Sequence, residues 1–267
     1  MNSSIRNKIQ VVKYDGNTLV ELEDEVAVEY PLTIYVDGEE FATMVCSPIN
    51  LEELVIGFLA SEGLVRLYDD IESMTFDEGK GLAYISLKVK QSINKEFYAK
   101  RFIGSCCGKS RQFYFHNDAR TARTVLSKTR ITVSQCFLLM KLLQEESIDF
   151  RQTGGVHNAA LCSVEDLLYI QTDIGRHNAL DKIYGICLKE KLSRSDKVIA
   201  FSGRVSSEVL LKVAKIGIGI ILSKSAPSTL AIELANDLGI TIVGFIRNNQ
   251  FNIYSNPERV IEGKSGF

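Results

Sequence analysis

Two adjacent cysteines, Cys106 and Cys107, lie in the stretch GSCCGKSR at residues 104–111. A glycine precedes and follows the pair, and no helical or alternating apolar pattern runs through the stretch, so we expect a loop that leaves the sulfur atoms exposed. Lys109 and Arg111 are cations, which stabilise a thiolate, the nucleophilic form of cysteine. The stretch therefore predicts thiol chemistry. The alternative is that both cysteines are small core residues, because free cysteine is commonly buried.

Cationic and hydroxyl side chains recur in three later loops, each placed just before an expected helix. The first loop carries Arg176 and His177, the second Arg204, and the third Lys224 and Ser225. Free N–H groups and the helix dipole attract anions at such places, and ligands of open α/β sheets bind beyond the carboxyl ends of the strands. We therefore expect a phosphate site. The alternative is that the serines only cap helices and the cations are only solvated. The loops match neither the glycine-rich dinucleotide pattern nor a P-loop.

Two of the three histidines lie in a repeated pattern, Gly-x-His-Asn-Ala, at residues 155–159 and 175–179. Their polar, glycine-rich surroundings make His157 and His177 candidates for ligand contact, whereas we expect His116 to be structural. A zinc site built from the cysteine pair and the two histidines is disfavoured, because adjacent cysteines suit a tetrahedral centre poorly. We expect no metal.

The composition is that of an ordinary soluble globular protein. The chain has 267 residues, 45% of them apolar and 24% charged, enough for one large domain or two small ones. A net charge of -2 argues against a general nucleic-acid surface. The longest apolar run, residues 216–222, is too short to span a membrane, and the N-terminus lacks the apolar core of a signal peptide. Six cysteines without such a signal predict reduced thiols in a cytoplasmic protein.

The N-terminal part predicts an α+β region that delivers the cysteine loop. The expected elements are strands at residues 26–36, 41–46, 71–76 and 82–89 and a helix that begins at residue 51. Asp37-Gly38 is typical of a hairpin turn, and Pro31 should confine the first strand to an edge or a bulge. Asn50 is the expected N-cap of the helix, and Gly63 should lie just past its end.

The C-terminal part alternates strands and helices, which predicts a parallel sheet with right-handed crossovers. We expect strands at residues 167–172, 198–201, 218–222, 240–246 and 252–255, and helices near residues 134–146, 178–192, 208–216 and 229–238. Thr132 or Ser134 can cap the first helix, and Asn178 the second. Two of the loops match when Ser202, Ser207 and Ala214 are aligned with Ser223, Ser228 and Ala235.

Several ordered motifs together resemble the formate dehydrogenase accessory sulfurtransferase family, the FdhD type. They are SCCGK at residues 105–109, TGGVHNA at 153–159, DIGRHNALDK at 173–182, SGR at 202–204, SKSAP at 223–227 and GFIR at 244–247. The resemblance implies a sulfur carrier that takes persulfide sulfur from a cysteine desulfurase. The carrier would transfer it to the molybdenum cofactor, bis-molybdopterin guanine dinucleotide, before insertion into formate dehydrogenase, whose activity requires it.

The same resemblance implies an α/β fold in two parts. Residues 1–125 would form the α+β region, and residues 126–267 a cytidine-deaminase-like, three-layer domain with a mostly parallel central sheet that binds the cofactor. The family also implies a homodimer, whereas the net charge and the short apolar runs predict no nucleic acid or membrane partner. The zinc signature of the deaminases is absent, so deamination is not expected.

The resemblance aligns Cys106 with the first family cysteine and Cys107 with the second and leaves both as candidates for the persulfide; we favour Cys107, with Cys106 as the residue that resolves or relays it. Many family members separate these cysteines by two residues, whereas here they are adjacent. Arg176, Arg204 and Lys224 would hold phosphates, and His177 would orient ligand or loop. The remaining expected cofactor contacts are Ser225 and, on the guanine side, Phe245, Ile246, Arg247, Asn248, Asn249 and Gln250.

Two other functions are compatible with the same residues. The first is a cofactor chaperone whose cysteines are incidental. The second is a hydrolase that uses Cys107 as the nucleophile and His157 or His177 as the base.

Overall fold

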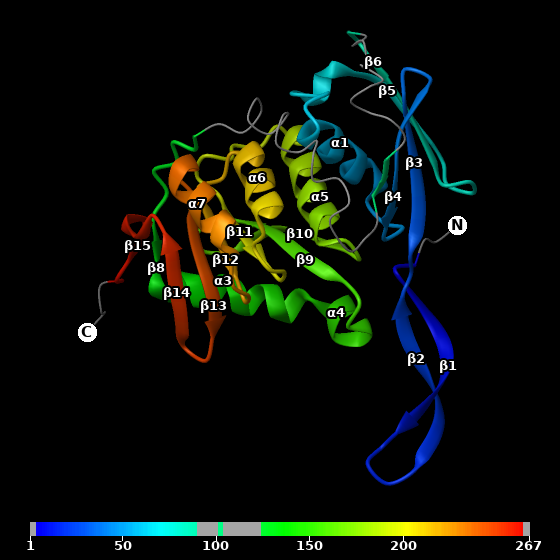
Figure 1. Cartoon of the computed structure of the whole chain (residues 1–267), viewed down its shortest axis with the longest axis horizontal. Coiled ribbons are helices and arrows are strands. Elements are labelled where there is room, and N and C mark those ends of the chain that lie inside the picture. Colours follow the sequence, from blue (N-terminus) through cyan, green and yellow to red (C-terminus); the bar gives the residue numbers. More distant parts are fainter. Residues whose placement is uncertain (1–3, 90–100, 104–123, 264–267) are drawn as a thin grey trace.

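The computed structural model describes residues 4–89, 101–103 and 124–263. Cys106, Cys107 and His116 lie outside the described residues. Within them the chain forms two large sheets, a set of helices around these sheets and a two-stranded ribbon that projects from the body (Figure 1). No helix in these ranges has the length and apolarity needed to cross a lipid bilayer.

The larger sheet has six strands in the order β10-β9-β11-β12-β13-β14. Its strands are β9 (His157–Cys162), β10 (Leu167–Asp173), β11 (Val198–Phe201), β12 (Ile220–Ser223), β13 (Thr241–Arg247) and β14 (Gln250–Ser255). The pairs β11–β12 and β12–β13 are parallel and the other pairs antiparallel, so only β9 and β14 run against the rest. The predicted α/β class with a mostly parallel central sheet is confirmed.

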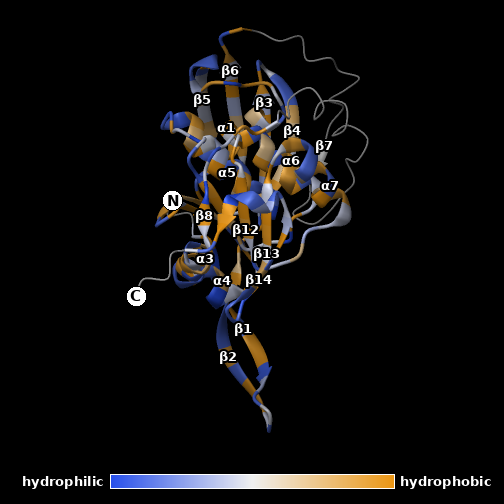
Figure 2. Cartoon of the chain, turned by 90° about the vertical axis from the view of Figure 1, so that its left-hand side faces the viewer, coloured by the Kyte–Doolittle hydropathy of each residue, from blue (hydrophilic) through white to orange (hydrophobic). Residues whose placement is uncertain are grey.

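Helices cover both faces of this sheet and make three layers (Figures 1 and 2). On one face lie α5 (Arg176–Lys189), α6 (Ser207–Ile216) and α7 (Thr229–Leu238), and on the other lies α3 (Val133–Glu146). Strand β11 shows the division, because Ile199 and Phe201 pack with the first group whereas Val198 and Ala200 pack with α3. Burial on both faces explains why the central strands are continuous apolar runs.

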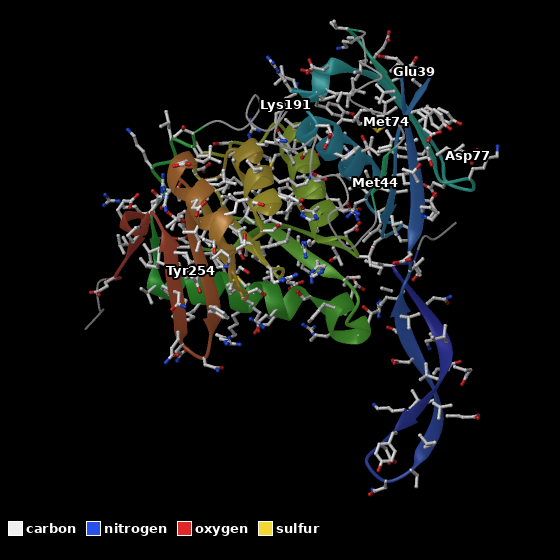
Figure 3. All side chains as sticks on the ribbon, viewed as in Figure 1. Glu39, Met44, Met74, Asp77, Lys191 and Tyr254 are labelled. Atoms are coloured by element: carbon white, nitrogen blue, oxygen red, sulfur yellow. The ribbon has the colours of Figure 1, made fainter. Side chains whose placement is uncertain are left out.

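The smaller sheet has the order β5-β6-β3-β4-β7. Its strands are β3 (Tyr30–Val36), β4 (Glu39–Cys46), β5 (Ile71–Asp77), β6 (Leu82–Leu87) and β7 (Arg101–Ile103), and helix α1 (Leu51–Ser61) packs on one face. Met44 and Met74 belong to this contact (Figure 3). Short elements complete the described chain: α4 (Ile148–Thr153), β8 (Ile131–Thr132), β15 (Val260–Ile261) and the 3-10 turns Tyr68–Asp70 and Pro257–Arg259.

Helix α1 also packs against α5, and two glycines bring the two backbones into contact. A Cβ atom on Gly57 would lie 1.7 Å from the carbonyl oxygen of Asp181, and one on Gly185 would lie 1.9 Å from that of Glu53. No side chain fits at either position without moving a helix. This crossing holds the smaller sheet against the larger one.

The ribbon consists of β1 (Arg6–Tyr14) and β2 (Leu19–Ala27), paired antiparallel along their whole length. It extends well beyond the rest of the molecule in both views (Figures 1 and 2). Residues 26 and 27, which were expected to begin the following strand, end β2 instead, and no local pattern predicted the ribbon.

Most other predicted elements are confirmed within one to three residues, with corrections at particular positions. Pro31 was expected to place its strand at an edge or a bulge, but β3 lies inside its sheet, between β4 and β6. Pairing with β6 begins only at Thr33, so the missing N–H of Pro31 removes no hydrogen bond to β6. Gly63 has φ +81° and follows α1 as predicted. Thr132 caps α3 in a reciprocal capping box with Gln135.

Asn50 is the N-cap residue of α1, as predicted, but its side chain does not cap the helix, and Asn178 is not a cap residue. The Asn50 side chain makes no cap hydrogen bond and instead donates to Gln171 across 2.7 Å. Asn178 is not the cap of α5, because the helix begins at Arg176 with Gly175 as its N-cap residue. The side-chain amides of both asparagines therefore make tertiary hydrogen bonds instead of capping the N-terminus of a helix.

Candidate functional site

The three predicted loops meet at one edge of the six-stranded sheet. Arg176 begins α5 just after β10, and its Cβ lies 3.6 Å from where a Cβ on Gly203 would stand. The backbone oxygen of Gly203 accepts a 2.9 Å hydrogen bond from the Ser223 hydroxyl. The backbone N–H of Phe245 lies 3.4 Å from the oxygen of Ser225. A continuous line of contacts therefore joins the ends of β10, β11, β12 and β13, which is the placement expected for a ligand site of an α/β sheet.

Asp173 organises the start of α5. Its buried carboxylate accepts hydrogen bonds from the backbone N–H of Gly175 at 2.8 Å, the Asn178 amide at 2.9 Å and the backbone N–H of Ser47 at 3.1 Å. It also pairs at 2.7 Å with Lys182, whose side chain is equally buried. With four partners, the carboxylate can stay charged inside the protein. The result is a rigid first turn of α5.

Charged side chains gather at that first turn. Nε of Arg176 is buried and makes no hydrogen bond to any described residue, and Nε2 of His177 lies 3.3 Å from a Glu208 carboxylate oxygen on α6. His177, with smaller effects from Arg176 and Lys212, lowers the pKa of Glu208 against the opposing effect of burial. A buried donor without a partner is costly, and an anion is the partner that would satisfy it.

His157, the other candidate histidine, opens strand β9 close to this cluster. Burial, followed by the positive charges of Arg176 and His177, lowers its pKa, although Asp173 acts in the opposite direction. The tertiary structure thus brings the two copies of Gly-x-His-Asn-Ala together, one at the start of a strand and the other at the start of a helix. A neutral imidazole at His157 is available to accept or donate one hydrogen bond.

The loops after β11 and β12 are built alike, but not in the predicted alignment. Val205 bridges to Pro227, and the helices begin at the N-caps Ser206 and Ser228, whose hydroxyls accept from the backbone of the third helical residue. Equivalent positions in the two loops are therefore one residue further apart in sequence than the predicted alignment, which paired Ser202 with Ser223. Arg204 and Lys224 are both exposed at this edge, free to reach a bound anion.

The predicted guanine-side residues divide into accessible and inaccessible positions. Arg247 lies at the end of β13 with its guanidinium 5.2 Å from the centre of the Phe245 ring, and residues 247–250 are exposed at the turn into β14. Phe245 has φ +54°, a strained conformation for a bulky residue that often marks a functional position. Ile246 is 2% exposed and belongs to the core beneath α3. It is therefore not available to a ligand, because its side chain packs in the core against α3.

The strand that leads into the cysteine loop ends near the same cluster. Strand β7 pairs parallel with β4, with Ile103 beside Met44. The next residue of β4, Val45, accepts a 2.9 Å hydrogen bond from the Asn178 amide, and Ser47 donates to Asp173. The last described residue before the loop therefore lies one strand spacing, about 4.8 Å, from a strand tied to the start of α5.

The four described cysteines are buried and unsuited to exchange chemistry. Burial raises the pKa of Cys136 and Cys162 to about 12 and that of Cys187 to about 11, and it also raises the pKa of Cys46. A protonated, inaccessible thiol is a poor nucleophile. Reactive thiols can then come only from outside the described residues.

Sequence reasoning missed three residues that shape this site: Ser47, Asp173 and Glu208. The contacts that identify Ser47 and Glu208 join residues that are distant in sequence; Ser47 is 126 residues from Asp173. A carboxylate in the first turn of a helix is common, so Glu208 carried no distinguishing signal. Only the packing of α6 against α5 reveals its contact with His177.

Comparisons with known proteins agree with this architecture. The model of the FdhD/NarQ family matches residues 27–261. A protein of Geobacillus kaustophilus named sulfur carrier protein FdhD is 57% identical over 253 residues, which are 95% of this chain and 96% of that protein. A Bacillus subtilis protein of the same name is 52% identical over 262 residues, 98% of this chain and 100% of its own length.

A solved structure has the same overall fold. It is that of a candidate formate dehydrogenase accessory protein from Desulfotalea psychrophila, with a TM-score of 0.78 and 25% sequence identity. The match covers 97% of this chain and 100% of that one. On the family match and these identities, the chain belongs to the FdhD/NarQ family.

Proposed function

We propose that this protein is a sulfur carrier that accepts persulfide sulfur on Cys107 from a cysteine desulfurase and transfers it to the molybdenum cofactor. The observation that carries the proposal is the connection between β7, β4 and the start of α5, which brings the last described residue before the cysteine loop close to the proposed anion site. Cys107 follows Ile103 by four residues, a reach of at most about 14 Å. We infer that a sulfur atom on this loop reaches a ligand held near the start of α5.

The names of the relatives support the same role. Proteins that align with nearly the whole chain at 52% and 57% identity are called sulfur carriers. The buried state of the four described cysteines adds support, because it leaves the loop thiols as the candidates for exchange.

The loading step is a balanced thiol exchange. The Cys107 thiolate attacks the outer sulfur of the desulfurase persulfide, the bond between the two sulfurs of that persulfide breaks, and the desulfurase thiolate leaves. Cys107 then holds the sulfur as its own persulfide, and no net oxidation occurs. The desulfurase thiolate takes up the proton that the Cys107 thiol lost when it became a thiolate.

Delivery requires that the substrate lie at the sheet edge while the sulfur leaves. Arg176, Arg204 and Lys224 provide cations for the phosphates of bis-molybdopterin guanine dinucleotide, and Ser225 and Phe245 flank the same surface. Attack of the Cys106 thiolate on the inner sulfur of the Cys107 persulfide would break the persulfide bond, expel the outer sulfur as hydrosulfide and form a disulfide between the two cysteines. The two electrons that reduce the outer sulfur come from the cysteine thiols. The cofactor would receive the sulfur before it enters formate dehydrogenase.

We expect Arg204→Ala and Lys224→Ala each to weaken binding of GDP, a fragment of the cofactor. Loss of one charge-assisted phosphate contact costs about 1.5–3 kcal/mol, which is roughly tenfold to a hundredfold in affinity. Titration calorimetry measures this. Lys141→Ala is the control, because Lys141 is exposed on α3, the helix on the opposite face of the sheet. Unchanged affinity in both site variants would place the anion site elsewhere.

We expect the reactive loop thiol to have a pKa below the ordinary cysteine value of about 8.5, because Lys109 and Arg111 stabilise the thiolate. The rate of alkylation by iodoacetamide against pH gives the pKa. The raised pKa values of the described cysteines keep them from contributing below pH 9. An inflection at or above the ordinary value would contradict activation by these cations.

A further inference from the structure

His157 lies between the first two of the three cationic loops. Strand β9 runs against β10 and β11, so its first residue lies at the edge where those two strands end. On one side His157 is opposite Asp173 in the register of β10. On the other side the backbone oxygen and N–H of Asn158 bind the N–H and the hydroxyl of Ser202, each across 2.9 Å. Ser202 is two residues before Arg204, so His157 is central at this edge.

The side chain of His157 points toward the face of the sheet that carries α5 and α6. Neighbouring residues of a strand point to opposite faces. Asn158 is turned toward the other face, because its amide donates a 2.9 Å hydrogen bond to Ser147 at the end of α3. Ala159 packs in the core beneath α5 and α6, which lie over this part of the sheet (Figure 1). His157 shares the face of Ala159, and Arg176 begins α5 on that face.

The positive charge around His157 is incompletely balanced. Burial, and then the charges of Arg176 and His177, lower the pKa of His157. Among the described residues Asp173 acts in the opposite direction, and this carboxylate already pairs with Lys182 across 2.7 Å. The imidazole is therefore neutral near pH 7 when the site holds no ligand.

The neighbouring carboxylates are also engaged. Glu208 on α6 lies 3.3 Å from Nε2 of His177. Toward the ribbon, on the side from which α4 leads into β9, Arg6 pairs with both Glu25 and Asp149. The described part of the site therefore gains a free negative charge only when a ligand brings one.

We propose that a phosphate group bound at the first turn of α5 is held by His157 as well as by Arg176, and that His157 takes up one proton as the phosphate binds. The phosphate dianion supplies the missing negative charge beside the imidazole. The ring gains its proton from solvent and donates a hydrogen bond to a phosphate oxygen, while the buried Nε of Arg176 gains an acceptor. The inference rests on the anion site of the proposed function and is independent of the persulfide step.

Binding then depends on pH in a definite direction. A charge of opposite sign within about 4–6 Å raises the pKa of a histidine by about 1–3 units. The gain in affinity is complete below the pKa of unliganded His157 and is lost as the pH rises through the higher pKa of the complex. A difference of one unit between the two pKa values is about tenfold in affinity. Release of the cofactor would return the proton to solvent.

NMR titration of the histidine side chains in the full chain measures proton uptake directly. The chain has three histidines, so the resonance of His157 is the one that persists in both His116→Asn and His177→Asn. With saturating GDP as the probe, we expect the pKa of His157 to rise by at least about one unit. An unchanged pKa in protein that binds GDP would overturn the proposal and leave the anion site standing.

Titration calorimetry with GDP at about pH 6 and about pH 8.5 tests the contact. His157→Asn should bind about tenfold more weakly than the wild type at the lower pH and nearly equally at the higher pH. The ionisation of GDP itself is common to both proteins. Lys141→Ala, a change on the exposed side of α3, should follow the wild type at both pH values.

The outcomes separate this inference from the proposed function. An equal loss at both pH values would show a structural role for His157 and overturn the proposal, as would unchanged affinity at both. A wild type that binds no GDP would refute the anion site together with the inference. Circular dichroism confirms that the variants are folded, and His157→Gln replaces His157→Asn if the latter is not; the NMR titration needs neither variant.

Discussion

We expect Cys107→Ser to abolish sulfur loading, whereas Cys106→Ser should still load but transfer poorly. Side chains of consecutive residues in an extended loop diverge, so the two sulfur atoms cannot present equally to one desulfurase. Intact mass after incubation with desulfurase and cysteine measures loading, as a gain of about 32 Da for one sulfur. Activation of apo formate dehydrogenase measures transfer.

The controls separate the competing functions. Cys187→Ser removes a buried thiol of raised pKa and should leave loading intact. Loading that survives in Cys107→Ser and vanishes in Cys106→Ser would reverse the two roles. Loading in the double variant would remove the loop from the mechanism, and cofactor delivery without loading would indicate a chaperone. Hydrolysis of a small ester that requires Cys107 and His157 or His177 would indicate a hydrolase.

Asp173→Ala should lower the free energy of unfolding by about 3–5 kcal/mol, since it leaves the Lys182 ammonium buried without its counter-charge. The variant also strips acceptors from Ser47 and Gly175. Urea denaturation measures the loss. Asp77→Ala is the matched control: its ion pair with Lys80 spans 3.3 Å in solvent, and its removal should cost less than about 1 kcal/mol. Equal losses in the two variants would refute the role assigned to the buried pair.

A milder change at the same position tests the connection between loop and site. Asp173→Asn keeps the size of the side chain but weakens the bonds that tie β4 to the start of α5. We expect loading by the desulfurase to persist and transfer to the cofactor to fall, because loading needs only the loop whereas transfer needs the loop and the anion site in register. Equal loss of both activities would indicate a general loss of structure instead.

The amino-acid sequence by itself determined most of the elements. Residues 198–201 and 229–238 match β11 and α7 to the residue, because a short apolar run bounded by polar loops has few other options, and a helix between Ser228 and Gly239 carries both of its end signals. Thr132 and Gly63 were correct for the same local reason. The three cationic loops also followed from sequence, since strands that alternate with helices bring their carboxyl ends to one edge.

Tertiary structure decided what local pattern leaves undetermined. The five-residue pattern around His157 begins a strand, whereas the same pattern around His177 begins a helix, because only the first is paired on both sides by β10 and β11. Asn178 was expected to cap a helix, but Val45 and Asp173, distant or unremarked in sequence, take up its amide. The pairing of β7 with β4, which brings the last described residue before the cysteine loop beside the strand that is tied to the start of α5, joins residues about sixty positions apart. Such contacts form because side chains pack together and because a buried charge is stable only beside an opposite charge or a hydrogen-bonding group. Neither cause produces a periodic pattern in the sequence, so local patterns do not predict them.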